Sequence, residues 1–222
     1  MKLGKRTYAP DKRAFLTYVA DIAGNDEANG NLRHYIDFST DCGEWGCPSH
    51  EKAETKFRDD VTMRLIERAG LDAEDFDCLL GGDLLNQIVP SSFSARSFAI
   101  PFSGLYCACA TFGQSLAIAS MMIGAGMSKV ICCTSSHFAT AERQYRYPLE
   151  LGTQPTPASQ RTVTGAGAVL VSDSYPGWRC PEITCYTLGE IIALGCTEAN
   201  NMGGGMARGG YETMAAHLRE RG

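Results

Sequence analysis

Apolar residues at helical spacing predict the clearest element of the chain, a helix over residues 49–69. Charged residues separate its apolar positions, which are Ala53, Phe57, Val61, Leu65 and Ile66. Ser49 is placed to cap the first turn, because its side chain can accept a hydrogen bond from an unpaired backbone N–H. Gly70 is placed to end the helix, since glycine readily adopts the left-handed conformation that often follows a last turn.

Short apolar runs bounded by turn residues predict the strands. We expect strands at residues 14–20, 77–82, 100–106, 129–135, 163–172 and 183–188. Further helices are expected at residues 91–98, 111–126 and 206–219. Strands and helices alternate along most of the chain, and this order predicts an α/β fold with a mainly parallel sheet and helices on both faces.

Two segments follow neither pattern. Residues 25–30 are expected to form a polar turn. Residues 141–161 are expected to form a surface excursion, because Pro148, Pro155 and Pro157 are too closely spaced for a core element. The Gly-x-Gly sequence at residues 165–167 lies in a predicted strand rather than before a helix, so it is not a dinucleotide site and no cofactor is expected.

An uncharged stretch of 32 residues runs from Ser97 to Ser128. It exceeds the roughly 20 residues that span a bilayer. However, Pro101 interrupts it, and glycine, alanine and serine dominate its second half. We therefore expect no transmembrane helix, and instead a helix at residues 111–126 that is buried on all sides within the fold.

A cysteine-bearing bend, Leu105–Phe112, comes directly before this small-residue helix. Cys109 would meet unpaired backbone N–H groups and the positive end of the helix dipole, which both favour a thiolate. The alternative is that Cys107 and Cys109 are small, inert core residues, since free cysteine is among the most buried residue types.

Composition narrows the classes of partner. The formal net charge is −5, and no basic stripe of the kind that binds nucleic acid is present, so no nucleic-acid partner is expected. The polar start of the chain has no signal-peptide pattern, and the ten cysteines therefore indicate reduced thiols in the cytoplasm. Cys42, Cys47 and His50 are an incomplete and loosely spaced ligand set, so no metal site is expected.

Four motifs carry a family resemblance: Gly-Gly-Asp-Leu-Leu-Asn-Gln at 81–87, Gly-Leu-Tyr-Cys-Ala-Cys-Ala-Thr at 104–111, residues 134–146, and Val-Thr-Gly-Ala-Gly-Ala at 163–168. Together they resemble the stage V sporulation protein AD family of endospore-forming bacteria, whose members are thiolase-like. The resemblance runs along nearly the whole chain and implies a thiolase-like fold. It also implies that residues 1–180 form the amino-terminal half of that fold and residues 181–222 begin a truncated second half.

The resemblance implies a role in sporulation without catalytic turnover. The protein would bind dipicolinic acid, or its calcium complex, for uptake into the developing spore beside membrane subunits. It would lie in the cytoplasm or at the periphery of the inner spore membrane. The alternative is a thiolase-type acyltransferase with Cys109 as nucleophile. Two positions depart from the family pattern: Cys107 stands where glycine is expected, and Ala110 where serine is expected.

The predicted ligand site combines the bend with the end of the strand at 129–135. A helix N-terminus suits an anion, and ligands of open α/β sheets collect at the carboxyl ends of strands. For His137 the alternative is that it is a buried histidine with satisfied hydrogen bonds. For Arg143 and Arg146 the alternative is that they form surface ion pairs with Glu142 or Glu150. The predicted ligand-binding residues are Cys109, Thr111, Ser136, His137, Arg143 and Arg146.

Self-association is a further expectation from the resemblance. Thiolase-like folds usually dimerise through the strand before the nucleophile, here residues 100–106, so a homodimer is expected. With the second half truncated, the outer face of the helix at 111–126 would remain as an exposed apolar patch.

Overall fold

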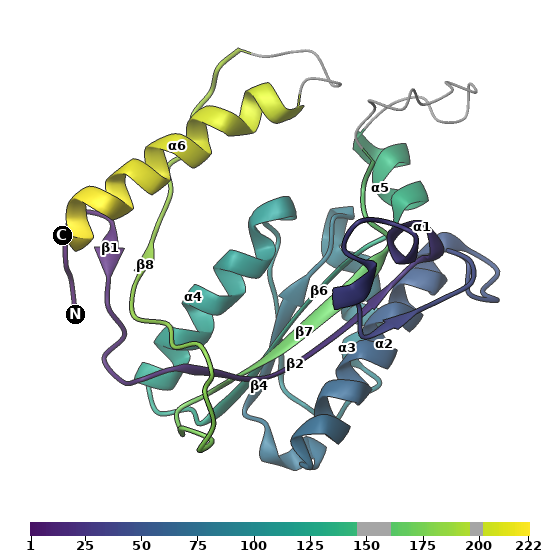
Figure 1. Ribbon diagram of the computed structural model, residues 1–222, viewed down its shortest axis with the longest axis horizontal. Helices are drawn as coiled ribbons and strands as arrows, with labels where there is room; N and C mark the ends of the chain where they lie inside the picture. Colours follow the sequence, from purple (N-terminus) through teal and green to yellow (C-terminus); the bar gives the residue numbers. More distant parts are fainter. Residues whose placement is uncertain (146–160, 196–201) are drawn as a thin grey trace.

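The computed structural model describes residues 1–145, 161–195 and 202–222, and its centre is a six-stranded sheet (Figure 1). The strands lie in the order β3-β2-β7-β6-β4-β5. Their bounds are β2 (Phe15–Ala23), β3 (Phe38–Ser39), β4 (Cys78–Gly82), β5 (Phe102–Gly104), β6 (Lys129–Ser136) and β7 (Gly165–Ser172). The helices are α1 (Asn25–Ala28), α2 (His50–Ala69), α3 (Val89–Ala95), α4 (Thr111–Gly124), α5 (Phe138–Tyr145) and α6 (Met202–Arg221).

The sheet is mixed, with one reversed strand. β4 pairs in parallel with both β5 and β6, and β2 pairs in parallel with β3. β7 lies between β2 and β6 and is antiparallel to both. Five strands therefore share one direction, which confirms the expected mainly parallel sheet.

Helices cover both faces of the sheet, as expected. Successive side chains of β6 point to opposite faces and therefore enter two different cores. Ile131 and Cys133 pack with Phe57 of α2 in one core. Val130 and Cys132 pack with Ile123 of α4 in the other. Figure 1 shows α2 and α3 on one side of the sheet and α4 on the other.

Both predicted ends of α2 are confirmed. The Ser49 side chain accepts a hydrogen bond from the backbone N–H of Lys52 at 3.3 Å. Gly70 adopts the left-handed conformation with φ 64°, and its N–H bonds back to the last turn. Local capping chemistry therefore fixes the length of this helix.

The helix α4 departs from the prediction that it is buried on all sides. Ala119, Ser120 and Ile123 are fully buried against the sheet. On the outer face, Met121 is 40% exposed. Small residues on the inner face let the helix lie close to the strands, while no described element covers the apolar outer face.

Several shorter elements also differ from the predictions. The expected polar turn at 25–30 contains the one-turn helix α1. The expected surface excursion begins with α5, since the prolines come only after Tyr145, and its remainder at 146–160 lies outside the described residues. The helix expected at 206–219 is longer and runs from Met202 to Arg221.

A small second sheet lies beside the main one. It pairs β1 (Thr7–Tyr8) with β8 (Tyr186–Thr187), and α6 packs on it (Figure 1). The strand expected at 183–188 therefore contributes only two residues and joins the start of the chain. The division of the chain at residue 180 stays a prediction. Among the described helices, none has the length and apolar content needed to cross a membrane.

Candidate functional site

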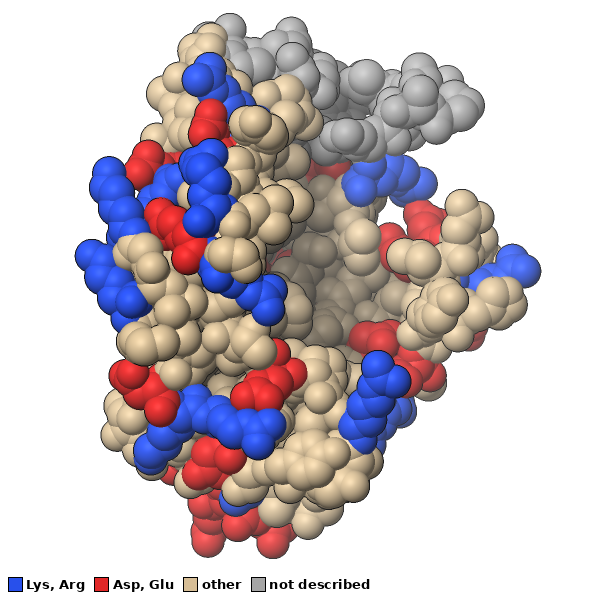
Figure 2. Space-filling view, turned by 60° about the vertical axis from the view of Figure 1, so that its left-hand side comes forward, with Lys and Arg blue, Asp and Glu red and all other residues tan. Residues whose placement is uncertain are grey.

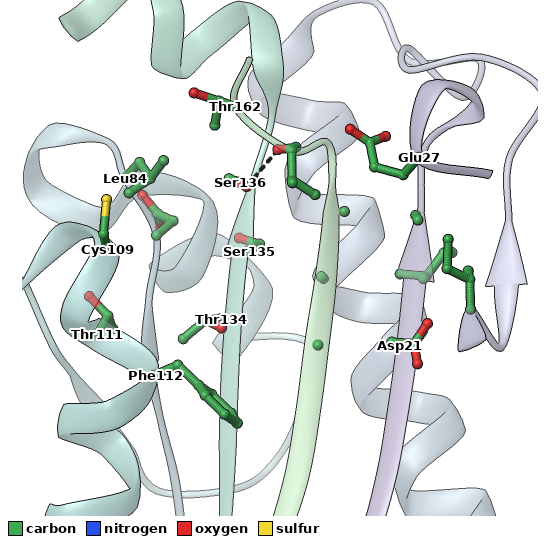
Figure 3. Close-up of a pocket in the computed structure, with 18 of the residues that line it drawn as sticks. Asp21, Glu27, Leu84, Cys109, Thr111, Phe112, Thr134, Ser135, Ser136 and Thr162 are labelled. Carbon is green, nitrogen blue, oxygen red and sulfur yellow. Dashed lines mark hydrogen bonds between the residues drawn. The ribbon is translucent and has the colours of Figure 1, made fainter. Parts of the chain in front are cut away.

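A cavity of about 670 Å³ opens at the ends of β2, β4 and β6 and at the start of β7. The space-filling view shows a deep hollow whose visible walls are largely uncharged (Figure 2). Figure 3 shows that the residues lining the cavity come from both halves of the sheet and from the start of α4. Parallel strands thus place the cavity where open α/β sheets commonly bind ligands.

Cys109 lies on this cavity at a strained bend. It belongs to the short 3-10 turn η4 (Ala108–Ala110), which leads directly into α4. Ala108 has φ 43°, a left-handed conformation that costs a non-glycine residue about 1 kcal/mol. The close packing of the bend also requires glycine at 82, because a Cβ there would overlap the carbonyl oxygen of Leu105.

Three of the six predicted ligand residues line the same cavity: Cys109, Thr111 and Ser136. The Thr111 hydroxyl is buried and accepts a hydrogen bond from the Cys107 N–H at 3.3 Å, which holds the bend. The Ser136 hydroxyl donates to the carbonyl oxygen of Val163 at 2.6 Å (Figure 3). These two hydroxyls are therefore already engaged within the protein.

His137 is buried and is not among the residues that line the cavity. Its Nδ1 accepts from the Ala139 N–H at 3.2 Å, so Nε2 carries the proton and donates to the Gly43 carbonyl oxygen at 3.0 Å. Burial lowers the pKa of the imidazole, which favours this neutral form. This geometry matches the alternative of a buried histidine with satisfied hydrogen bonds.

Arg143 is not among the residues that line the cavity. Arg143 forms an ion pair with Glu51 of α2, rather than with the acidic residues considered from the sequence. Its side chain is half exposed. Arg146 lies outside the described residues.

Acidic residues that sequence reasoning missed line the cavity instead. They are Asp21, Glu27 and Asp83, and the described lining contains no lysine, arginine or histidine. Asp83 is saturated, because it accepts from the N–H groups of Leu85 and Ser91 and from the Ser91 hydroxyl. Burial raises the pKa of Asp21. The polar character of residues 25–30 was the only sequence signal near Glu27.

The two carboxylate oxygens of Glu27 differ in their hydrogen bonds. Its Oε1 accepts from the Thr164 N–H at 3.1 Å, which ties α1 to the start of β7. Its Oε2 is buried and has no hydrogen-bond partner within the protein. A buried carboxylate oxygen without a partner is costly, and because Glu27 lines the cavity, rotation of its carboxylate would offer this oxygen to a ligand.

Two buried ionisable side chains of α2, Arg58 and Glu54, support the floor of the site. Arg58 is 1% exposed and donates to the carbonyl oxygens of Gly82 and Cys133 at 3.1 and 3.2 Å, which joins the ends of β4 and β6. Glu54 accepts from the hydroxyl of Ser135, a cavity residue, at 2.8 Å. Burial raises the pKa of Glu54 to about 7.

Among the described residues, no group of three His, Cys, Asp or Glu side chains is arranged to hold a metal ion.

The model of the stage V sporulation protein AD family matches residues 4–222. The Stage V sporulation protein AD of Bacillus subtilis (strain 168) is 37% identical over 222 residues, which is 99% of this chain. The chain belongs to the stage V sporulation protein AD family. It spans 65% of the length of that family member from Bacillus subtilis.

Solved structures show the fold of this family member. A variant of OleA from Xanthomonas campestris matches it with a TM-score of 0.62 at 15% identity, over 96% of this chain and 73% of that chain. A second OleA variant matches with a TM-score of 0.52 at 15% identity, over 73% of this chain and 59% of that chain. The chain therefore has the thiolase-like fold that its motifs implied.

Proposed function

We propose that this family member binds dipicolinic acid, as its calcium complex, in the cavity beside Cys109 and does so without catalysis. The cavity of about 670 Å³ has a size typical of small-molecule sites. Its walls include the aromatic ring of Phe112 and the aliphatic side chains of Ile22 and Leu32, which suit the faces of a planar aromatic ring.

The charge of the lining supports the calcium complex over the free ligand. Dipicolinate carries two carboxylates, and the described lining offers carboxylates but no lysine or arginine to pair with them. Bound calcium neutralises the ligand and accepts further oxygen ligands, since it takes six to eight. Glu27 lines the cavity, and rotation of its carboxylate would bring the unpartnered Oε2 to the calcium ion to complete that coordination.

Calorimetric titration with dipicolinate, with and without calcium, tests this proposal. We expect binding at least tenfold tighter with calcium, because the carboxylates of ligand and lining otherwise repel one another. Glu27→Gln keeps an oxygen for the Thr164 N–H but loses the charge, and should weaken calcium-dependent binding at least tenfold. Glu74→Gln, an exposed change in another loop, should leave affinity unchanged. Equal affinity without calcium, or wild-type affinity in Glu27→Gln, would contradict the proposal.

The position of Cys109 favours a second candidate, thiolase-type acyl transfer. The cysteine faces the cavity at the start of α4, where a thioester could be attacked. Acyl transfer would also need a general base beside the cysteine. None of the described histidines lines the cavity, and both ring nitrogens of His137 are hydrogen-bonded to the backbone. After incubation with acyl-CoA, we expect intact mass spectrometry to show no adduct on Cys109. An adduct that disappears in Cys109→Ala would establish acyl transfer instead.

The proposed role also places the protein in the cytoplasm or at the inner spore membrane, as the family resemblance implies. There it would deliver its ligand to the membrane subunits of the uptake machinery.

A further inference from the structure

A chain of hydrogen bonds joins Cys185 to α6, at the small sheet of β1 and β8 and apart from the cavity residues. The Sγ atom of Cys185 lies 3.9 Å from Nε2 of His217. The other ring nitrogen, Nδ1, lies 2.8 Å from the Thr187 hydroxyl. That hydroxyl lies 2.8 Å from the hydroxyl of Thr7, which is fully buried.

Glu220 at the end of this chain sets the direction of every bond in it. Its carboxylate accepts from the backbone N–H groups of Arg6 and Thr7 and from the Thr7 hydroxyl. Because an ionised carboxylate only accepts, Thr7 donates to Glu220 and must accept from the Thr187 hydroxyl. Thr187 in turn accepts from Nδ1–H of His217. The neutral ring therefore presents a bare Nε2 to the Cys185 thiol.

A nucleophile, a base and a group that orients the base are the parts of an activated cysteine. We propose that Cys185 and His217 form a second reactive site, which exchanges with low-molecular-weight disulfides to place a mixed disulfide on Cys185. Nε2 of His217 takes the thiol proton as the sulfur attacks one sulfur of the disulfide. A new S–S bond forms, the old S–S bond breaks, and the departing thiolate takes the proton from the imidazolium.

Disulfide exchange suits this site better than acyl transfer. Acyl transfer requires preorganised donors for a developing oxyanion. Exchange requires only a thiolate, its base and access to the sulfur, and the negative charge passes from one sulfur to another. Cys185 is partly exposed just before β8, so a small disulfide can reach it.

Timed incubation with oxidised glutathione, acid quenching and peptide mass mapping test the proposal. We expect mixed disulfide to form on Cys185 at least ten times more slowly in His217→Gln than in the wild type. The rates at Cys107 and Cys109 should not change, and the buried Cys132 and Cys133 should stay unreactive, which shows that the variant is folded. Thr187→Val keeps the base but loses its orienting partner, and should slow the reaction at Cys185 alone.

Chemical rescue separates a base from a structural role. In His217→Ala, added imidazole should restore the rate at Cys185 by more than it accelerates Cys109. A wild-type rate at Cys185 in folded His217→Gln would overturn the proposal, and so would a rescue no larger at Cys185 than at Cys109. Because Cys185 is not among the cavity residues, these outcomes are independent of dipicolinate binding.

Discussion

Glu54 couples the floor of the cavity to pH. Its carboxyl is buried, and burial raises its pKa from 4.5 to about 7. Below pH 4.5 both the folded and unfolded chains keep this proton. Between pH 4.5 and 7 the unfolded chain releases the proton while the folded chain retains it, so stability falls as pH rises. Over that interval the loss amounts to about 3 kcal/mol, at 1.36 kcal/mol per pH unit.

Urea unfolding of the wild type and of Glu54→Gln at pH 5 and pH 8 measures this effect. For each protein the measured quantity is the free energy of unfolding. Raising the pH from 5 to 8 should lower it in the wild type by up to about 3 kcal/mol more than in Glu54→Gln, because glutamine has no proton to lose. Glu74→Gln serves as the exposed control and should track the wild type at both pH values. If the two proteins differ in unfolding free energy by the same amount at pH 5 and at pH 8, the pKa of Glu54 is not raised in the folded protein.

The residues of the site were only partly predictable. Cys109 and Thr111 are identified by a local pattern, a bend before a small-residue helix. The environment of His137 depends on the Gly43 carbonyl, which is 94 residues distant, and Arg143 finds Glu51 at a separation of 92 residues. A local sequence pattern cannot predict hydrogen-bond partners that are so distant along the chain.

At the scale of elements, local chemistry predicted α2 fully and α5 not at all. Ser49 and Gly70 mark both ends of α2 in the sequence, and the structure confirms both. The helix α5 has only eight residues and lies next to a proline-rich segment, so its turns were assigned to that segment. Likewise, β8 is only two residues long, because its pairing with β1 and not its own pattern defines it.

The prediction of a homodimer rests on the edge strand β5. It pairs with β4 from Leu79↔Phe102 to Gly81↔Gly104, and no other described strand pairs with it. An unpaired strand edge is a template for pairing with a second chain. On the outer face of α4, Met121 adds an exposed apolar side chain.

Light scattering at micromolar concentration should therefore give twice the chain mass of 24.0 kDa. Ser103→Lys places a charge on the exposed edge of β5 and should shift the protein toward the monomer. Ser174→Lys adds the same charge at an exposed turn after β7 and should leave the dimer intact. A wild type that elutes and scatters as a monomer would rule out this mode of association under those conditions.

At the scale of the whole molecule, the alternation of strands and helices was enough to predict the class of fold and the two-sided cover of the sheet. The reversal of β7 was not predictable from its composition, because a buried antiparallel strand and a buried parallel strand are both short apolar runs. The cavity joins residues from β2 and α1 with residues from the bend at Cys109. Its acidic wall depends on that long-range assembly and therefore emerged only from the structure.

The central place of β7 has a consequence for how the protein is made. β7 alone joins β2 to β6, yet it is the last strand of the main sheet to leave the ribosome. At 5–20 residues per second, β2 waits roughly 7–30 s for this partner. Once β6 has also been made, the nascent chain carries two open strand edges, on β2 and on β6, that could pair wrongly with a neighbouring copy. Chaperones that shield nascent chains would therefore matter most before residue 172 is synthesised.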